Sequence, residues 1–250
     1  MEENITRVGK MKYSVVTTFS PKGYEVYGRK FIDTFSKFWT CPLYVYYEGE
    51  KPLDACERAI WKPLDDDVDR QRFMANHKDT ELHDYRKCAV KFSHKVWAIT
   101  SAPRESDNLI WLDADCETFA PVTDEMLKGV CADPGQVGSF LGRPYHRHSE
   151  TGFWSVRMNN CGDDFLDELR RCYTSGDIFN LSEWHDCMAF DYVRRKFERA
   201  GHRFKNLCPG AHGLDVFIHS RLKDFIRHNK GPGAKLREYG DTMSGAEEAA

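Results

Sequence analysis

The feature that most constrains this chain is a short apolar run that ends in two closely spaced carboxylates. Leu109–Leu112 is entirely apolar, and Asp113 and Asp115 follow it with a single alanine between them. The run predicts a buried strand that stops at the first aspartate. Two carboxylates this close repel each other and lose hydration unless a cation lies between them. The pair therefore predicts a site for a hard cation, Mg²⁺ or Mn²⁺, that also holds a diphosphate.

The composition indicates a globular protein of one larger domain. With 250 residues, 41% of them hydrophobic and 13% aromatic, the chain can bury a sizeable core. Its net charge of -3 provides no overall attraction to nucleic acid. Residues 1–4 lack the basic and apolar parts of a signal peptide, and no apolar run approaches the ~18 residues that span a bilayer. Nine scattered cysteines without a Cys-x-x-Cys pair indicate reduced thiols, so we expect a cytoplasmic protein.

The first fifty residues predict a strand, a helix and a second strand. Residues 13–18 and 43–47 are β-branched, aromatic or apolar, which favours strands. Between them, Ser20 and Pro21 supply a helix cap and a first helical residue, and aromatic residues recur every three or four positions up to Phe38. This order favours a parallel sheet with a right-handed crossover. Later patterns predict strands at 137–141 and 153–156 and helices at 124–130 and 165–173.

Two further helices carry charged residues close to their apolar stripes. Apolar residues at alternating spacings of three and four predict a helix at 82–99, with Arg86 and Lys95 about a quarter-turn from the stripe on opposite sides. Another helix is predicted to begin near Ser182, with Asp186 at the head of its inward stripe. Asp186 either complements the helix dipole or points into a cleft over the sheet.

The role of several polar segments stays open at this level. Residues 50–79 are predicted to form an irregular, mobile stretch, and their acidic run Asp65–Asp67 is a solvated loop or, less favoured, a metal site. The basic and aromatic segment 142–152 is either a binding loop or a solvated turn. Zinc ligation by His146 and His148 is disfavoured, because no cysteine lies near them in the sequence.

The C-terminal part offers a further group of ligands. His228 precedes a glycine-rich turn with Gly231 and Gly233, and Lys235 follows the turn. An imidazole can complete a metal shell, backbone amides at glycines can face oxygens, and a lysine can neutralise a phosphate. The same segment can also form a plain turn.

Together these residues resemble the nucleotide-sugar glycosyltransferases of the GT-A fold, the family of glycogenin and the bacterial lipopolysaccharide galactosyltransferases. Those proteins carry a strand that ends Leu-Asp-Ala-Asp, as Leu112–Asp115 does here. They also carry a His-x-x-Gly-x-x-Lys segment near the C-terminus. His228–Gly231 matches its first part, and Lys235 falls one residue later than in the pattern.

The resemblance implies a metal-dependent enzyme of α/β class. Asp113, Asp115 and His228 would bind Mn²⁺ or Mg²⁺ against the two phosphates of a nucleotide-diphosphate sugar, and a UDP-sugar is the expected donor. Asp186 would act at the reacting sugar, as a general base if the enzyme inverts configuration or as an orienting group if it retains it. Glycogenin-like proteins retain configuration, so retention is favoured. The implied organisation is an extension at 1–10, a single GT-A (Rossmann-like) domain at 11–240 with a central, mostly parallel sheet flanked by helices, and a flexible tail at 241–250.

Other positions are implied to surround the donor and the acceptor. The nucleoside would contact Thr17, Thr18, Phe19 and Glu48, the phosphates or donor sugar would contact Arg86, Asp113, Gly231 and Lys235, and the acceptor cleft would include Gly152–Phe153. The acceptor itself stays open between a saccharide, a lipid-linked sugar, a protein and a hydroxylated base in nucleic acid. Residues suited to nucleic acid are basic or aromatic: the segment Arg143–His148, with Tyr145, then Trp154, Arg194, Arg195, Arg199 and Arg203.

Other protein classes share part of this pattern. A haloacid dehalogenase-type phosphatase also has an Asp-x-Asp pair after an apolar strand, but it needs Thr or Val where this chain has Glu117. A sugar-nucleotide nucleotidyltransferase would carry a glycine-rich, lysine-bearing loop after its first strand, and Ser20–Gly23 matches that poorly. A binding module without activity is disfavoured by the intact Asp113, Asp115 and His228.

Overall fold

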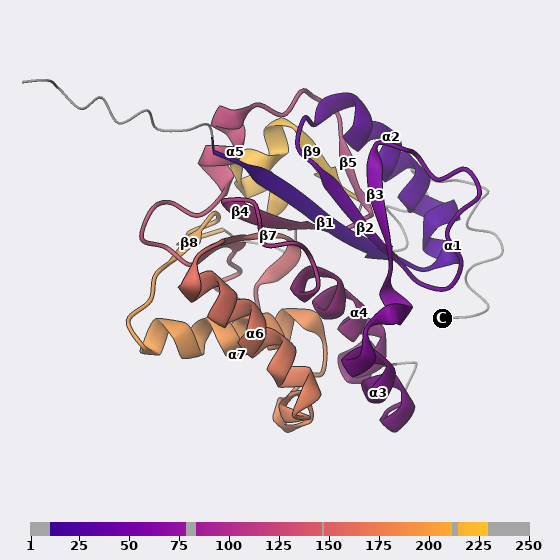
Figure 1. The fold of residues 1–250 in the computed structure, drawn as a ribbon. Helices are drawn as coiled ribbons and strands as arrows, with labels where there is room; N and C mark the ends of the chain where they lie inside the picture. Colours follow the sequence, from indigo (N-terminus) through magenta and orange to yellow (C-terminus); the bar gives the residue numbers. More distant parts are fainter. Residues whose placement is uncertain (1–10, 79–83, 147, 212–214, 230–250) are drawn as a thin grey trace, which may run out of the picture.

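A seven-stranded sheet with the strand order β3-β2-β1-β4-β7-β6-β8 forms the centre of the molecule (Figure 1). The computed structural model describes residues 11–78, 84–146, 148–211 and 215–229. The strands of this sheet are β1 (Tyr13–Phe19), β2 (Leu43–Tyr47), β3 (Ala59–Pro63), β4 (Asn108–Leu112), β6 (Gly138–Leu141), β7 (Glu150–Arg157) and β8 (Phe204–Asn206). A second sheet pairs β5 (Cys116–Thr118) with β9 (Ile226–His228).

The main sheet is mostly parallel. β1 pairs in parallel with β2 and β4, β2 with β3, and β6 with β8, whereas β7 runs antiparallel to both of its neighbours. The predicted α/β fold with a central, mostly parallel sheet flanked by helices is therefore confirmed. Because β1, β2 and β4 are parallel, they end at the same edge of the sheet, and the residues that follow them come together there.

Helices cover both faces of this sheet (Figure 1). One face carries α2 (Arg29–Phe38), α5 (Asp124–Val130) and the C-terminal segment, and the other carries α3 (Val68–Asn76), α4 (Ala89–Thr100), α6 (Asn160–Thr174) and α7 (Asp186–Arg199). β4 lies between the two cores: Ile110 packs into the first and Trp111 into the second, and all five of its residues are buried. The apolar run before Asp113 is thus a buried strand, as predicted. Within the described residues, no helix has the length and apolar character to cross a bilayer.

The segment after β1 folds as its local signals predict. Ser20 Oγ accepts a hydrogen bond from the main-chain N–H of Gly23 at 3.1 Å, and Pro21 is the first helical residue of α1 (Pro21–Gly23). A π-helical turn at Tyr24–Gly28 then leads directly into α2. Ser20–Gly23 is therefore the start of a helix, not the phosphate-binding loop of a nucleotidyltransferase.

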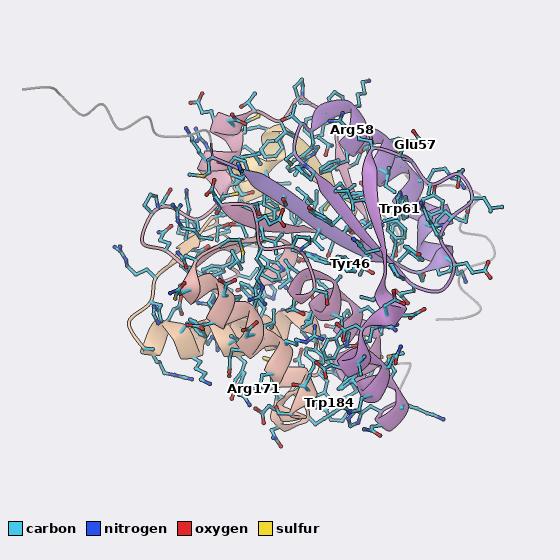
Figure 2. All side chains as sticks on the ribbon, in the orientation of Figure 1. Tyr46, Glu57, Arg58, Trp61, Arg171 and Trp184 are labelled. Atoms are coloured by element: carbon cyan, nitrogen blue, oxygen red, sulfur yellow. The ribbon has the colours of Figure 1, made fainter. Side chains whose placement is uncertain are left out.

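The stretch 50–79 is not irregular throughout, so that prediction is wrong for β3 and α3. Trp61 of β3 (Figure 2) packs its indole on the ring of Phe19, with the ring centroids 6.1 Å apart. Asp67 caps α3, and both of its carboxylate oxygens accept hydrogen bonds from Arg170 of α6 at 2.7 Å. Part of the acidic run is therefore bound to the domain by a partner far away in the sequence.

The helix predicted at 82–99 begins later, at Ala89. Asp84 accepts hydrogen bonds from the main-chain N–H and the guanidinium of Arg86, which stabilises a 3-10 turn at Tyr85–Lys87. Cys88, with φ -90° and ψ 63°, separates this turn from α4. Residues 79–83 lie outside the described part of the chain, and Arg86 is not on the helix.

Candidate active site

A cleft of about 660 Å³ lies where β1, β2 and β4 end. Residues predicted for the site that line it are Thr18, Phe19, Glu48, Asp113, Asp115, Asp186 and His228. They lie at or just after the ends of β1, β2 and β4, at the start of α7 and at the end of β9, so five distant parts of the chain meet here. Another wall is formed by α4, with Val90, Lys91, Phe92, His94 and Lys95.

Other predicted positions do not line this cleft. Thr17 is completely buried, because side chains alternate along β1 and it faces the opposite side of the sheet from Thr18. Arg86 lies on the exposed turn before α4, away from the cleft lining. Gly231 and Lys235 lie outside the described residues, as do the predicted extension and tail.

Lys95 joins two of the carboxylates in the cleft. Its ammonium nitrogen lies 2.7 Å from Oδ1 of Asp113 and 2.8 Å from Oδ2 of Asp186, and its side chain is only 11% exposed. Trp111 Nε1 also donates to Asp113 Oδ1 at 2.6 Å, and Thr151 Oγ1 donates to Asp186 Oδ2 at 2.5 Å. The helical pattern located Lys95 beside a possible cleft, but only the fold shows its two acidic partners.

These contacts determine the charges at the centre of the cleft. Burial disfavours the charged form of Asp186, but the Lys95 ammonium and His185 outweigh burial and hold the pKa of this carboxyl at about 2. Burial raises the pKa of Asp113, and repulsion from Asp115 raises it further. The attraction of Lys95 lowers it but does not outweigh these two effects. Burial disfavours the charged form of Lys95, but the charges of Asp113 and Asp186 outweigh burial and raise the pKa of Lys95. Lys95 is therefore a permanent cation between two carboxyl groups.

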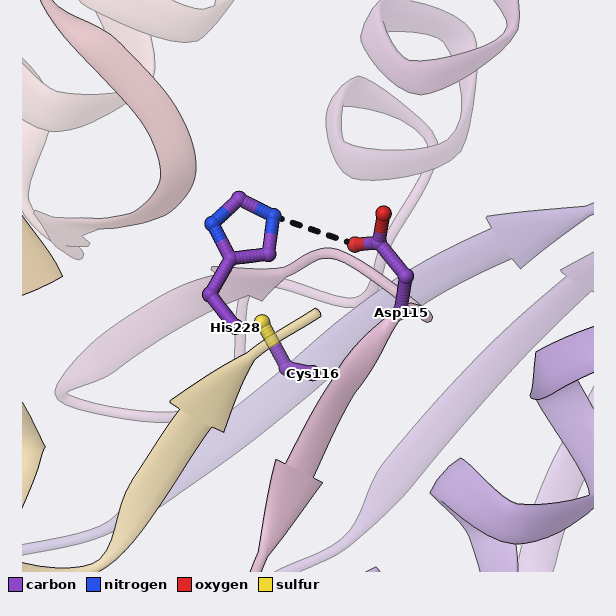
Figure 3. Close-up of side chains that lie close together, drawn as sticks. All are labelled: Asp115, Cys116 and His228. Carbon is purple, nitrogen blue, oxygen red and sulfur yellow. Dashed lines mark ion pairs between the residues drawn. The ribbon is translucent and has the colours of Figure 1, made fainter. Parts of the chain in front are cut away.

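Asp115 and His228 approach each other at another wall of the cleft (Figure 3). Nε2 of His228 lies 3.2 Å from Oδ1 of Asp115, and the two side chains are 3% and 14% exposed. The β5–β9 ladder brings them together, because Cys116 pairs with His228 and the N–H of Asn229 donates to the Asp115 carbonyl. Gly152 leaves room for the imidazole, since a Cβ there would lie 2.8 Å from His228 Cε1.

The residues at this wall fit a divalent cation of the predicted kind. Asp115 and His228 offer one oxygen and one nitrogen, in a group with Cys116 whose ligand atoms all lie within 4.8 Å of one another. Burial raises the pKa of Cys116 well above its ordinary value, so this thiol stays protonated and is a poor ligand. Asp113 is not part of this group, and its Oδ1 is bound by Lys95 and Trp111. Mg²⁺ and Mn²⁺ accept such a partial protein shell, because water and phosphate complete it.

Glu48 and His94, which line the same cleft, offer an acceptor and a neutral donor. Glu48 follows β2, and burial raises the pKa of its carboxyl. Nη2 of Arg70 lies 3.0 Å from His94 Nδ1, and a guanidinium can only donate, so this nitrogen accepts. Burial and the charge of Arg70 lower the pKa of His94 to about 4, which leaves a neutral ring with its proton on Nε2. Such a pair suits a nucleobase, which offers both N–H and carbonyl groups.

The basic and aromatic residues predicted for a nucleic-acid acceptor are partly internal. Arg143 is buried against the Ser149 carbonyl and Glu150, and Arg194 is buried in an ion pair with Asp191. Trp154 packs in the core and cannot stack on a base, so that expectation is wrong. Phe153 is also a core residue rather than part of the cleft lining. The exposed members of the group are Tyr145, His146, Arg195, Arg199 and Arg203, and Arg147 lies outside the described residues.

Among known proteins, some solved structures are similar to this chain at low sequence identity. No protein-family model and no curated protein matches the chain. Among solved structures, the chain is similar to a glycosyltransferase involved in the glycosylation of the major capsid of PBCV-1, with 15% identity, a TM-score of 0.49 and coverage of 91% of this chain and 98% of that one. It is also similar to mouse xyloside xylosyltransferase 1 in its apo form, with 11% identity, a TM-score of 0.47 and coverage of 79% and 85%. At these levels of similarity, a function for this chain rests on the residues of its own cleft.

Proposed function

We propose that this protein is a metal-dependent glycosyltransferase that moves a sugar from a nucleoside-diphosphate sugar, with uridine as the expected nucleoside, to an acceptor hydroxyl. The observation that carries the proposal is the approach of Asp115 and His228 to 3.2 Å within a cleft that also contains Asp186 and Lys95. A volume of about 660 Å³ is in the range of clefts that enclose small-molecule ligands.

Each wall of the cleft has a role in this proposal. Asp115, His228 and Oδ2 of Asp113 would hold the cation against the diphosphate of the donor. A divalent ion bound there supplies Lewis-acid stabilisation of the charge on the leaving nucleotide. Glu48 and His94 would contact the base, because they offer an acceptor and a donor in one recess.

The charge of Asp186 supports retention of configuration. A general base works best when its pKa is close to the working pH, and the pKa of Asp186 is held at about 2. Its Oδ2 is also occupied by Lys95 and Thr151. Both observations favour a carboxylate that orients or stabilises the reacting sugar over one that removes a proton from the acceptor.

The surroundings of the cleft support a saccharide acceptor over nucleic acid. Arg143 and Arg194 are committed to internal ion pairs, and Trp154 is in the core. A polyanion would lack these contacts, and the net charge of -3 adds no general attraction.

The test is the binding of UDP with and without Mn²⁺, measured by calorimetry in wild type and in Asp115→Asn. Loss of a second-shell partner already weakens metal binding by about 10–100-fold, so loss of this ligand should reduce the Mn²⁺-dependent affinity by at least ~100-fold. Glu117→Gln is the matched control, because Glu117 lies on β5 two residues after Asp115. This variant should bind UDP and Mn²⁺ like wild type. Circular dichroism would verify that both variants fold.

A donor screen complements this measurement. Nucleotide sugars are incubated with the wild-type enzyme and Mn²⁺ in the absence of acceptor, and release of free nucleoside diphosphate is followed. The proposal predicts slow hydrolysis of at least one donor that stops when the metal is removed. Unchanged UDP affinity in Asp115→Asn, or the absence of binding to every nucleotide sugar, would contradict it.

A further inference from the structure

Three metal-ligand side chains meet outside the donor cleft, next to the first turn of α7. They are His148, which precedes β7, and Glu183 and His185, which precede α7. Their ligand atoms all lie within 4.8 Å of one another, and their side chains are 16%, 7% and 2% exposed. None of the three lines the cleft that contains Asp115 and His228. This group, called here the His148 cluster, is therefore separate from the metal site of the proposed function.

The distances in the His148 cluster are close to those of a tetrahedral metal site. Oε2 of Glu183 lies 2.8 Å from Nε2 of His185 and 3.8 Å from Nε2 of His148. Two ligand atoms at 2.0–2.1 Å from zinc and at the tetrahedral angle lie about 3.3 Å apart. The two separations fall on either side of this value, so shifts of about half an ångström would bring each of these two pairs to the separation found in a zinc shell.

The other ring nitrogen of His148 has the contact that orients a metal-binding imidazole. His148 Nδ1 lies 3.1 Å from the Ser149 carbonyl oxygen, and metal-bound histidines typically donate their second N–H to such an acceptor. Zinc on Nε2 of His148 would leave the proton on Nδ1, where the Ser149 carbonyl can accept it. Arg143 Nη2 lies 3.0 Å from the same Nδ1 and donates to it without a metal, so this contact would be given up, whereas the bonds of Arg143 to the Ser149 carbonyl and Glu150 would stay.

We propose that His148, Glu183 and His185 form a zinc site whose fourth position is taken by water. Two imidazoles and one carboxylate are ligands that zinc accepts in tetrahedral geometry, whereas Mg²⁺ and Ca²⁺ prefer shells of oxygen. Zinc at Nε2 of His185 leaves the proton on Nδ1, so the long 3.4 Å cap bond from the Met188 N–H would be given up.

The zinc would tie the segment before β7 to the first turn of α7. The same two elements are joined in the cleft by the hydrogen bond from Thr151 to Asp186. Because Asp186 follows His185 directly, a metal on His185 restricts the position of the carboxylate that faces the sugar. The His148 cluster would thus position Asp186 without contacting the substrate.

The closing experiment titrates zinc alone into metal-free, full-length protein that carries His228→Ala, since this change removes the other metal site. The expected result is a single zinc ion per chain, counted by atomic emission. Adding His148→Ala or Glu183→Gln should weaken zinc binding by at least about 100-fold. His146→Ala is the matched control, because His146 is an exposed histidine of the same segment, and it should leave the affinity unchanged.

Two further measurements keep the result interpretable. Circular dichroism and thermal unfolding establish that each variant folds, and His148→Gln replaces His148→Ala if the latter does not. Cobalt bound in place of zinc should give the visible bands of a tetrahedral site without a thiolate charge-transfer band, although the Cys187 thiol lies within hydrogen-bond reach of both His148 and His185.

Absence of zinc binding, or equal affinity in the parent, His148→Ala and Glu183→Gln, would overturn the proposal. Loss of binding in His146→Ala, or a thiolate band with cobalt, would overturn the ligand set. Zinc binding is measured without nucleotide, so its failure is independent of the UDP test on Asp115.

Discussion

Lys95 connects two carboxylates to which the sequence assigned different roles. Its ammonium lies 2.7 Å from Asp113 and 2.8 Å from Asp186, and all three side chains are largely shielded from water. A buried ion pair adds little net stability once desolvation is counted, but a buried carboxylate without its cation is costly. Lys95 is therefore the cation with the largest influence on the protonation of both Asp113 and Asp186.

Replacement of Lys95 by Met is expected to lower the free energy of unfolding by about 3–5 kcal/mol, because two carboxylates lose their counter-charge. Urea unfolding measures this change. The double variant Lys95→Met/Asp186→Asn should recover part of the loss, since it removes one of the uncompensated charges. Lys91→Met, an exposed position one turn earlier on α4, is the control and should change stability by no more than about 0.5 kcal/mol. Equal losses in the single and double variants would contradict the role of the ion pairs.

His94 makes the folded protein less stable in mild acid. Burial and Arg70 lower its pKa from 6.5 to about 4, so the unfolded chain takes up a proton in this range before the folded chain does. Stability is therefore lost as the pH falls from about 6.5 to about 4, by up to roughly 3 kcal/mol. Urea unfolding across this range should show a smaller loss for His94→Gln than for wild type. Parallel pH profiles for the two proteins would show that the imidazole is not responsible.

At the level of elements, α3 illustrates how a polar stretch acquires structure from distant partners. Asp67 accepts a hydrogen bond from the N–H of Arg70 at the start of the helix and two from the guanidinium of Arg170. The guanidinium of Arg170 also lies 4.9 Å above the ring of Trp97, so α3, α4 and α6 meet at one point. Burial opposes the charge of Asp67, but these hydrogen bonds outweigh it and lower the pKa of the carboxyl.

Replacement of Asp67 by Ala should lower the free energy of unfolding by about 2–4 kcal/mol, because the helix loses its cap and Arg170 loses a charged acceptor. Asp66→Ala, at an exposed neighbouring position, should have an effect of about 0.5 kcal/mol or less. Because the folded pKa of Asp67 is depressed, its contribution is present above the ordinary value of 3.8 and is lost as the pH falls below it. Thermal unfolding of wild type, Asp67→Ala and Asp66→Ala at neutral pH measures these effects. Equal midpoints for Asp67→Ala and wild type would contradict the stabilising role of Asp67.

For the whole molecule, the parallel sheet explains why residues far apart in the sequence share one cleft. Thr18, Glu48 and Asp113 each lie at or just after the end of a parallel strand, and the strand order places those ends side by side. The C-terminal segment returns along β5 and brings His228 to Asp115. The two sequence motifs, one ending at Asp115 and one beginning at His228, thus bring two side chains close together in the fold.

Local signals predicted the elements that depend on neighbouring residues. β2 and α5 have the predicted bounds, β1 and β4 differ by one residue, and Ser20 caps the helix that its position indicates. β3, α3 and the late start of α4 escaped prediction, because side-chain contacts stabilise them more than periodicity does. Similarly, α7 begins at Asp186 rather than near Ser182, because His185 provides the cap.

The sequence by itself determined the α/β class, the buried strand before Asp113 and the candidate ligands, because apolar periodicity, caps and a short motif are properties of neighbouring residues. Only the tertiary structure decided which charges face one another. Lys95 between Asp113 and Asp186, and Glu183 between two histidines, are partnerships across elements whose order in the sheet and packing on it no short-range pattern encodes. The chemistry of the cleft depends on those partnerships, since burial makes each charge responsive to its partner.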